Sequence, residues 1–95
     1  MRHLRTLKDG DYKAVYTELT ENSFFKGFVL FSYGLAVVGI ERTSKGLRAV
    51  RFCDKSEISN TTAKHIKAFS DKFGISFNDK QQKFDDLPCI GELIL

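Results

Sequence analysis

Two segments in the first third of the chain have the pattern of β-strands. Residues 12–19 alternate between two faces, and residues 24–31 are rich in aromatic and β-branched side chains. Gly27 interrupts the second segment, which indicates a bulge or a close approach of another backbone. The short polar side chains of residues 20–23 favour a turn between the two strands, because they can hydrogen-bond to nearby backbone groups.

A β-hairpin is predicted between Tyr33 and Phe52. Its first half contains an uninterrupted apolar run at residues 35–38, which is typical of a central strand covered on both faces. Gly46 ends a short polar stretch and can take the positive φ that a tight turn requires. The chain is then expected to return as a strand over residues 47–53.

The pattern of an amphipathic helix extends over about residues 60–73. Three polar residues at its start are suitable N-caps, because their side-chain oxygens can accept from a free backbone N–H: Ser59, Asn60 and Thr61. Apolar residues then recur at i, i+3 and i+7 and form one stripe: Ile66, Phe69 and Phe73. Gly74 provides the residue that ends many helices.

The chain after this helix is less regular. Residues 75–77 fit a short strand, and residues 78–86 are polar and predict a loop. Residues 87–95 are mostly apolar, so we expect them to dock on the domain as an edge strand or short helix that begins near Pro88.

These elements predict an α+β fold, with a small antiparallel sheet of three to four strands and one main helix packed on one face. The chain has 95 residues, of which 42% are hydrophobic, and nine of them are Phe, so it can form a real core. It contains no internal repeat and no segment with the composition of a linker. We therefore expect a single domain over residues 1–95.

Apolar runs, N-terminal charges and cysteine content indicate the cellular compartment of the protein. No apolar run reaches the length that crosses a bilayer, and the basic start of the chain is followed by charged residues where a signal peptide would be apolar. Two cysteines, Cys53 and Cys89, are too few for a disulfide framework and are expected to be packed thiols. We expect an intracellular, cytoplasmic protein with no membrane contact.

Catalytic chemistry is not indicated. The two histidines and two cysteines have none of the spacings of a metal site, and the glycines form no phosphate-binding loop. A nucleophilic pair of a cysteine with His65 has no support in the sequence. We expect no catalytic residue, no metal ligand and no cofactor.

One octamer has a partial likeness to a nucleic-acid motif. Residues 26–33 resemble the RNP1 motif of RNA-recognition domains at Lys26, Gly27, Phe28 and Tyr33. The second stacking aromatic is replaced by leucine, and too little chain precedes the octamer for the strands and helix that the motif follows. The octamer is therefore interpreted as an aromatic-rich core strand.

The candidate binding residues come from two observations. Arg48 and Arg51 on one strand, with Lys64 and Lys67 on the helix, form a possible phosphate-binding surface, although interspersed acidic residues indicate an ordinary solvated one. The polar start of the helix adds Thr61, Lys64 and His65, which lie where anions bind helix N-termini. The alternative is that His65 packs at the core boundary and bonds to a neighbouring strand or to water.

Two stretches carry a resemblance to a known family. Ser32-Tyr33-Gly34 leads into an apolar strand and hairpin, and Thr61-Thr62-Ala63-Lys64-His65-Ile66 then opens the helix. This order resembles a family of short uncharacterised bacteriophage proteins with an S-Y-x-T-like strand start and a T-T-x-x-H helix start. The resemblance covers about residues 32–74, and Leu35 stands where the pattern has threonine. It implies a phage or prophage origin and a hairpin-plus-helix unit, without a known activity.

The leading functional hypothesis is a small phage-encoded accessory protein that binds a host macromolecule, such as a component of an antiviral defence system including CRISPR. The first alternative is a nucleic-acid-binding module that uses the basic strand and helix. The second is a homo-oligomeric structural protein, such as a homodimer, in which residues 90–95 pair with those of another copy.

Overall fold

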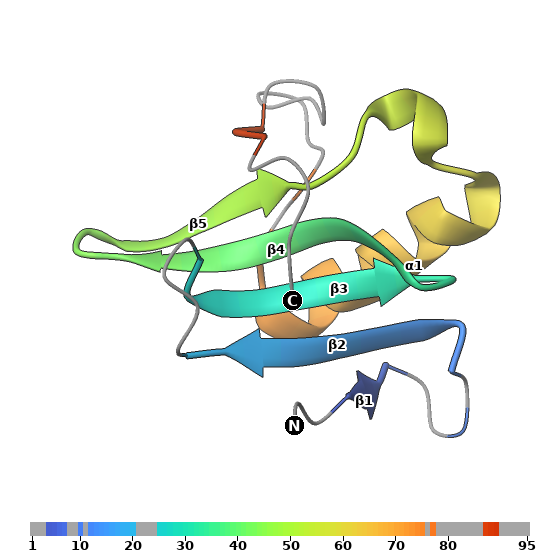
Figure 1. The fold of residues 1–95 in the computed structure, drawn as a ribbon, viewed down its shortest axis with the longest axis horizontal. Coiled ribbons are helices and arrows are strands. Elements are labelled where there is room, and N and C mark those ends of the chain that lie inside the picture. Colours follow the sequence, from blue (N-terminus) through green and yellow to red (C-terminus); the bar gives the residue numbers. More distant parts are fainter. Residues whose placement is uncertain are drawn as a thin grey trace.

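The computed structural model describes residues 4–7, 10, 12–20, 25–75, 77 and 87–89. Its strands are β1 (Arg5–Thr6), β2 (Ala14–Leu19), β3 (Gly27–Ser32), β4 (Leu35–Thr43) and β5 (Gly46–Arg51). A short 3-10 helix, η1 (Lys55–Glu57), and one α-helix, α1 (Asn60–Phe73), follow. The strands lie side by side in chain order, each antiparallel to the next, and α1 lies across one face of the sheet (Figure 1).

The α+β architecture predicted from the sequence is confirmed, but the predicted strand number is wrong. The described residues form a sheet of five strands rather than three or four. The additional strand, β1, has two residues, which is too short to produce an alternating pattern. Only its pairing with β2, where Arg5 lies opposite Tyr16, makes it a strand.

Both faces of the sheet carry apolar clusters. Along β3, Leu30 belongs to the cluster that includes Ile66 and Phe69 of α1, whereas Val29 and Phe31 belong to the cluster on the opposite face. This alternation follows from the two-residue period of a strand. A core on each side explains how a sheet with a single covering helix in the described residues buries so many side chains.

A β-bulge in β4 interrupts the alternation. Leu30 pairs with Val38 and Phe31 pairs with Ala36, so Val37 is an extra residue on β4. Val37 and Val38 are both 0% exposed, as predicted for this apolar run of a central strand. The carbonyl of Val37 accepts the backbone N–H of Phe52 at 3.0 Å, which continues the sheet past the end of β5.

Gly27 marks a close approach of two backbones rather than the bulge. Its φ is 147°, and a Cβ at this position would lie 1.9 Å from the carbonyl oxygen of Ile40 on β4. The prediction from the sequence named both possibilities, and the close approach is the one that the structure has. The bulge lies four residues further along the same strand pair.

The helix has the predicted bounds and caps. Ser59 is the N-cap, and its Oγ accepts the N–H of Thr62 at 3.1 Å. Gly74 has a φ of 69° and its N–H bonds to the carbonyl of Ser70, as expected for the residue that ends a helix. Ile66 and Phe69 are buried on the side that faces the sheet.

The short strand predicted over residues 75–77 is not present in the described residues there. Ile75 and Phe77 lie outside any strand, and Phe77 instead fills the core, with its ring stacked 5.8 Å from that of Phe69. The prediction fails because an apolar residue after a helix can insert into the core as well as join a sheet.

The docking of the C-terminal segment is confirmed at its beginning. Cys89 forms a parallel bridge with Arg51 at the edge of the sheet, and the Arg51 N–H bonds to the Pro88 carbonyl at 3.0 Å. Residues 21–24, which include most of the predicted turn, and the predicted loop (residues 78–86) lie outside the described residues. The rest of the C-terminal segment (residues 90–95) lies outside them as well. Within the described residues, no helix has the length and apolar character to span a membrane.

Candidate functional site

A two-residue turn joins β3 to β4 and presents Tyr33 to solvent. Tyr33 and Gly34 have φ values of 53° and 83°, and positive φ at both positions is the requirement of a type I′ hairpin turn. The Tyr33 side chain is 58% exposed. A non-glycine residue with positive φ is uncommon, and such positions concentrate at functional sites.

A buried polar network fixes the base of this turn. Ser32, the last residue of β3, shares a hydrogen bond of 3.0 Å with the Thr62 hydroxyl and one of 2.8 Å with Nδ1 of His65. Ser59 donates to the Thr62 hydroxyl at 3.1 Å, so the helix N-cap belongs to the same network. The network connects the end of β3 to the first two turns of α1. It therefore restricts the backbone at the base of the β3–β4 turn.

His65 lies between this network and the surface. Its ring is half-buried, bonds to β3 through Ser32 and packs against Tyr33, with ring centroids 5.7 Å apart. This is the boundary histidine that the sequence offered as one of two interpretations. Thr61 and Lys64 are exposed beside it, so the helix start also carries the polar residues of the other interpretation.

Two further exposed residues surround Tyr33. The backbone N–H of Tyr33 donates to the carbonyl of Lys13 at 2.8 Å, which places Tyr12, 79% exposed, beside the turn. Leu35, the first residue of β4, is 43% exposed. Three of the exposed large hydrophobic residues therefore belong to the end of the sheet at which β3 turns into β4. This end of the sheet is on the right of Figure 1. We call Tyr12, Tyr33, Leu35 and His65 the turn surface.

The four basic residues proposed from the sequence do not form one surface. Arg48 lies opposite Glu41 and pairs with it, on the face of the sheet away from α1. Lys64 and Lys67 are exposed on α1, across the sheet, and Lys67 is 3.8 Å from Asp71. The two-residue period of β5 directs Arg48 and Arg51 to opposite faces, as a strand assignment of this segment already implies, and the packing of α1 decides which face carries Arg48.

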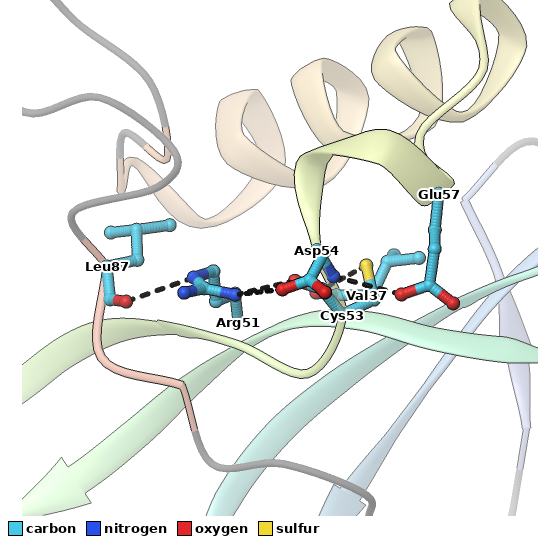
Figure 2. Close-up of polar contacts among 6 residues, drawn as sticks. All are labelled: Val37, Arg51, Cys53, Asp54, Glu57 and Leu87. Carbon is cyan, nitrogen blue, oxygen red and sulfur yellow. Dashed lines mark hydrogen bonds and ion pairs between the residues drawn. The ribbon is translucent and has the colours of Figure 1, made fainter.

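Arg51 connects Leu87 of the C-terminal segment to the chain between β5 and η1. Its Nε donates to the Leu87 carbonyl at 3.2 Å, and its Nη1 donates to the Cys53 carbonyl at 3.0 Å (Figure 2). The same Nη1 lies 3.2 Å from Oδ1 of Asp54, whose own N–H bonds to Glu57. The side chain of Arg51 is only 16% exposed, and these contacts are all within the fold.

Comparison with known proteins gives no assignment. No protein-family model, no curated protein and no solved structure matches this chain. The resemblance to short bacteriophage proteins therefore stays a prediction. Within the described residues, no group of three histidine, cysteine or acidic side chains is placed to hold a metal ion.

The two cysteines have different surroundings. Cys53 is buried beside β4, as predicted, with its Sγ 3.8 Å from the Val37 carbonyl. Cys89 is exposed, so the prediction of a packed thiol is wrong there. Burial, with added repulsion from the carboxylates of Glu57 and Asp54, raises the pKa of the Cys53 thiol from 9.0 to about 11. As the pH rises, the Cys53 thiol ionises in the unfolded chain before it ionises in the folded protein. Its contribution to folding stability is therefore complete below pH 9 and is lost as the pH rises from 9 to about 11.

We expect iodoacetamide at pH 8 to alkylate Cys89 and spare Cys53. With a pKa of about 11, about one Cys53 in a thousand is a thiolate at pH 8, against about one in ten for a thiol of pKa 9.0. Peptide mass spectrometry over a time course measures both rates. In urea both residues should react at similar rates. Equal rates in the folded protein would show that Cys53 is not shielded.

Proposed function

We propose that this protein acts by binding another protein through the turn surface. The observation that carries the proposal is the exposed Tyr33, held at positive φ on a two-residue turn whose base is fixed by the Ser32 network. Tyrosine is enriched among the few residues that supply most of the energy of protein interfaces. A residue already held in one conformation loses less entropy on binding.

The surroundings of Tyr33 support a protein partner. Tyr12 and Leu35 extend the exposed apolar area on either side of the turn, and the polar edge of the helix start borders it. An apolar centre with a polar rim is the usual anatomy of a protein interface. As the resemblance to phage proteins implies, we expect the partner to be a host protein, with an antiviral defence component as the leading class and the host cytoplasm as the location.

The test compares the full chain with its Tyr33→Ala variant. Each protein is tagged, incubated with bacterial host lysate and washed, and the retained proteins are quantified by mass spectrometry. We expect a host protein whose retention falls at least about tenfold in the variant, because loss of a central aromatic anchor typically has an effect of this size.

Leu47→Ala is the matched control. Leu47 is also 58% exposed, but it lies on β5, near the tip of the β4–β5 hairpin at the opposite end of the sheet. Its removal should leave retention unchanged, and thermal unfolding of both variants checks that each one folds. Equal retention by the Tyr33→Ala variant, or failure of the full chain to retain any host protein, would refute the proposal.

A further inference from the structure

Exposed lysines border the turn surface along α1. His65 and Lys72 are seven residues apart, which is about two helical turns, so they lie on the same flank of the helix. His65 contacts Tyr33 at one end of this flank, and the Lys72 ammonium lies 5.7 Å from the ring centroid of Tyr16 at the other. Lys64 is also exposed, but it is eight residues from Lys72 and is therefore turned about 80° from it around the helix, towards Lys67 and Asp71.

The sheet adds a third cation to this side of the molecule. Arg5 of β1 lies directly opposite Tyr16 of β2, and residues opposite each other in an antiparallel pair point to the same face. Tyr16 packs against Phe69 and Phe73 of α1, so Arg5 lies on the helix side of the sheet. Arg5 is exposed. We call Arg5, Lys64 and Lys72 the cationic row.

The carboxylates that the structure describes near the cationic row pair with other cations. Glu18 is on the same face of the sheet, opposite Phe28, but it pairs with Arg42. Asp71 of α1 pairs with Lys67. Among the described residues, no ion pair joins a carboxylate to any member of the cationic row. Counting the described residues alone, this side of the molecule carries an excess of positive charge next to the turn surface.

We propose that the partner presents an acidic protein surface, which covers the cationic row while Tyr33 anchors the contact. This inference rests on the proposed function and specifies the chemistry of the partner. Complementary charge steers association and excludes partners with like charge. Lys64 and Lys72 are separated by about 12 Å along the helix axis, so their charges act at separate points of the partner.

A nucleic acid fits this face less well than an acidic protein. Protein surfaces that bind nucleic acids are much more densely positive, because phosphates repeat at short intervals along the strand. The cationic row contains only three residues, on β1 and on two separate turns of α1. An acidic protein surface, with separated carboxylates and an apolar centre, matches both the spacing of the cations and the exposed Tyr33.

The experiment uses two anionic probes on the full chain, poly-L-glutamate and a single-stranded oligo-dT. Binding is followed by fluorescence anisotropy of the labelled probe at about 50 mM salt, where screening is weak. The double variant Lys64→Glu/Lys72→Glu is compared with Lys26→Glu/Lys45→Glu, which changes charge equally at exposed positions away from the Tyr33 end of the sheet.

We expect poly-L-glutamate to bind more tightly than oligo-dT, and the Lys64/Lys72 reversal to weaken it at least about tenfold, because like charges are then juxtaposed. The Lys26/Lys45 reversal should change affinity less than about threefold. Tighter binding of oligo-dT, absence of binding, or equal effects of both reversals would overturn the inference. If Tyr33→Ala abolishes capture of a host protein but the Lys64/Lys72 reversal does not weaken it, the proposed function stands and the acidic partner does not.

Discussion

Gly27→Ala is expected to lower the free energy of unfolding by at least about 3 kcal/mol, the sum of overpacking and backbone strain. The new Cβ would lie 1.9 Å from the carbonyl oxygen of Ile40, and both groups belong to backbones that are fixed in the sheet. The φ of 147° at this position is also one that side chains rarely adopt. Small domains are only marginally stable, so much of the variant should be unfolded. Urea denaturation followed by circular dichroism measures the change.

The Gly46→Ala variant distinguishes backbone strain from overpacking. Gly46 also has a positive φ, 120°, but a Cβ there would meet no atom within 4 Å. This variant should show the backbone strain alone, about 1 kcal/mol. Similar losses for the two variants would mean that the contact between Gly27 and Ile40 is looser than the structure has it.

Phe69→Ala is expected to destabilise the protein by about 3–5 kcal/mol, the usual range for removing a large aromatic side chain from a core. Phe69 is 0% exposed and is the centre of an aromatic group on the helix side of the sheet. Its ring packs against Phe73 at 4.9 Å, Phe77 at 5.8 Å and Tyr16 at 6.1 Å between centroids. Truncation leaves a cavity lined by side chains that belong to separate segments and cannot readily close over it.

The control for Phe69→Ala is Lys67→Ala on the same helix. Lys67 is exposed, and its pair with Asp71 at 3.8 Å is of a kind that contributes little. Chemical denaturation of both variants, analysed with a common slope, gives the difference. A loss below about 1.5 kcal/mol for Phe69→Ala would show that α1 is not anchored through this residue.

Local signals in the sequence predicted the best-defined elements. The bounds of α1 followed from a polar N-cap, an apolar stripe and Gly74, each of which acts on neighbours within a few residues. The β4–β5 hairpin followed in the same way from an apolar run and a turn at Gly46. Such features depend on backbone geometry and short-range hydrogen bonds, so they can be inferred without the fold.

Only part of the candidate site could be predicted from the sequence. His65 and Thr61 were named because they start the helix, but the partner of His65 is Ser32, 33 residues away. The Tyr33-Gly34 pair contains the glycine typical of a tight hairpin turn, and that signal could have identified the turn between β3 and β4. The bond between Ser32 and His65 exists only because α1 packs over the end of β3.

The sequence by itself determined the α+β class, the helix with its caps and the strands with their apolar pattern, because these depend on interactions between near neighbours. Only the tertiary structure decided which charges share a side of the molecule. In the structure, Arg48 and Lys64 lie on opposite sides of the sheet, whereas Arg5 and Lys72 lie on the same side. Arg51 donates a hydrogen bond to the Leu87 carbonyl. The physical reason is that register and helix placement set these distances, and both depend on packing between residues far apart in the chain.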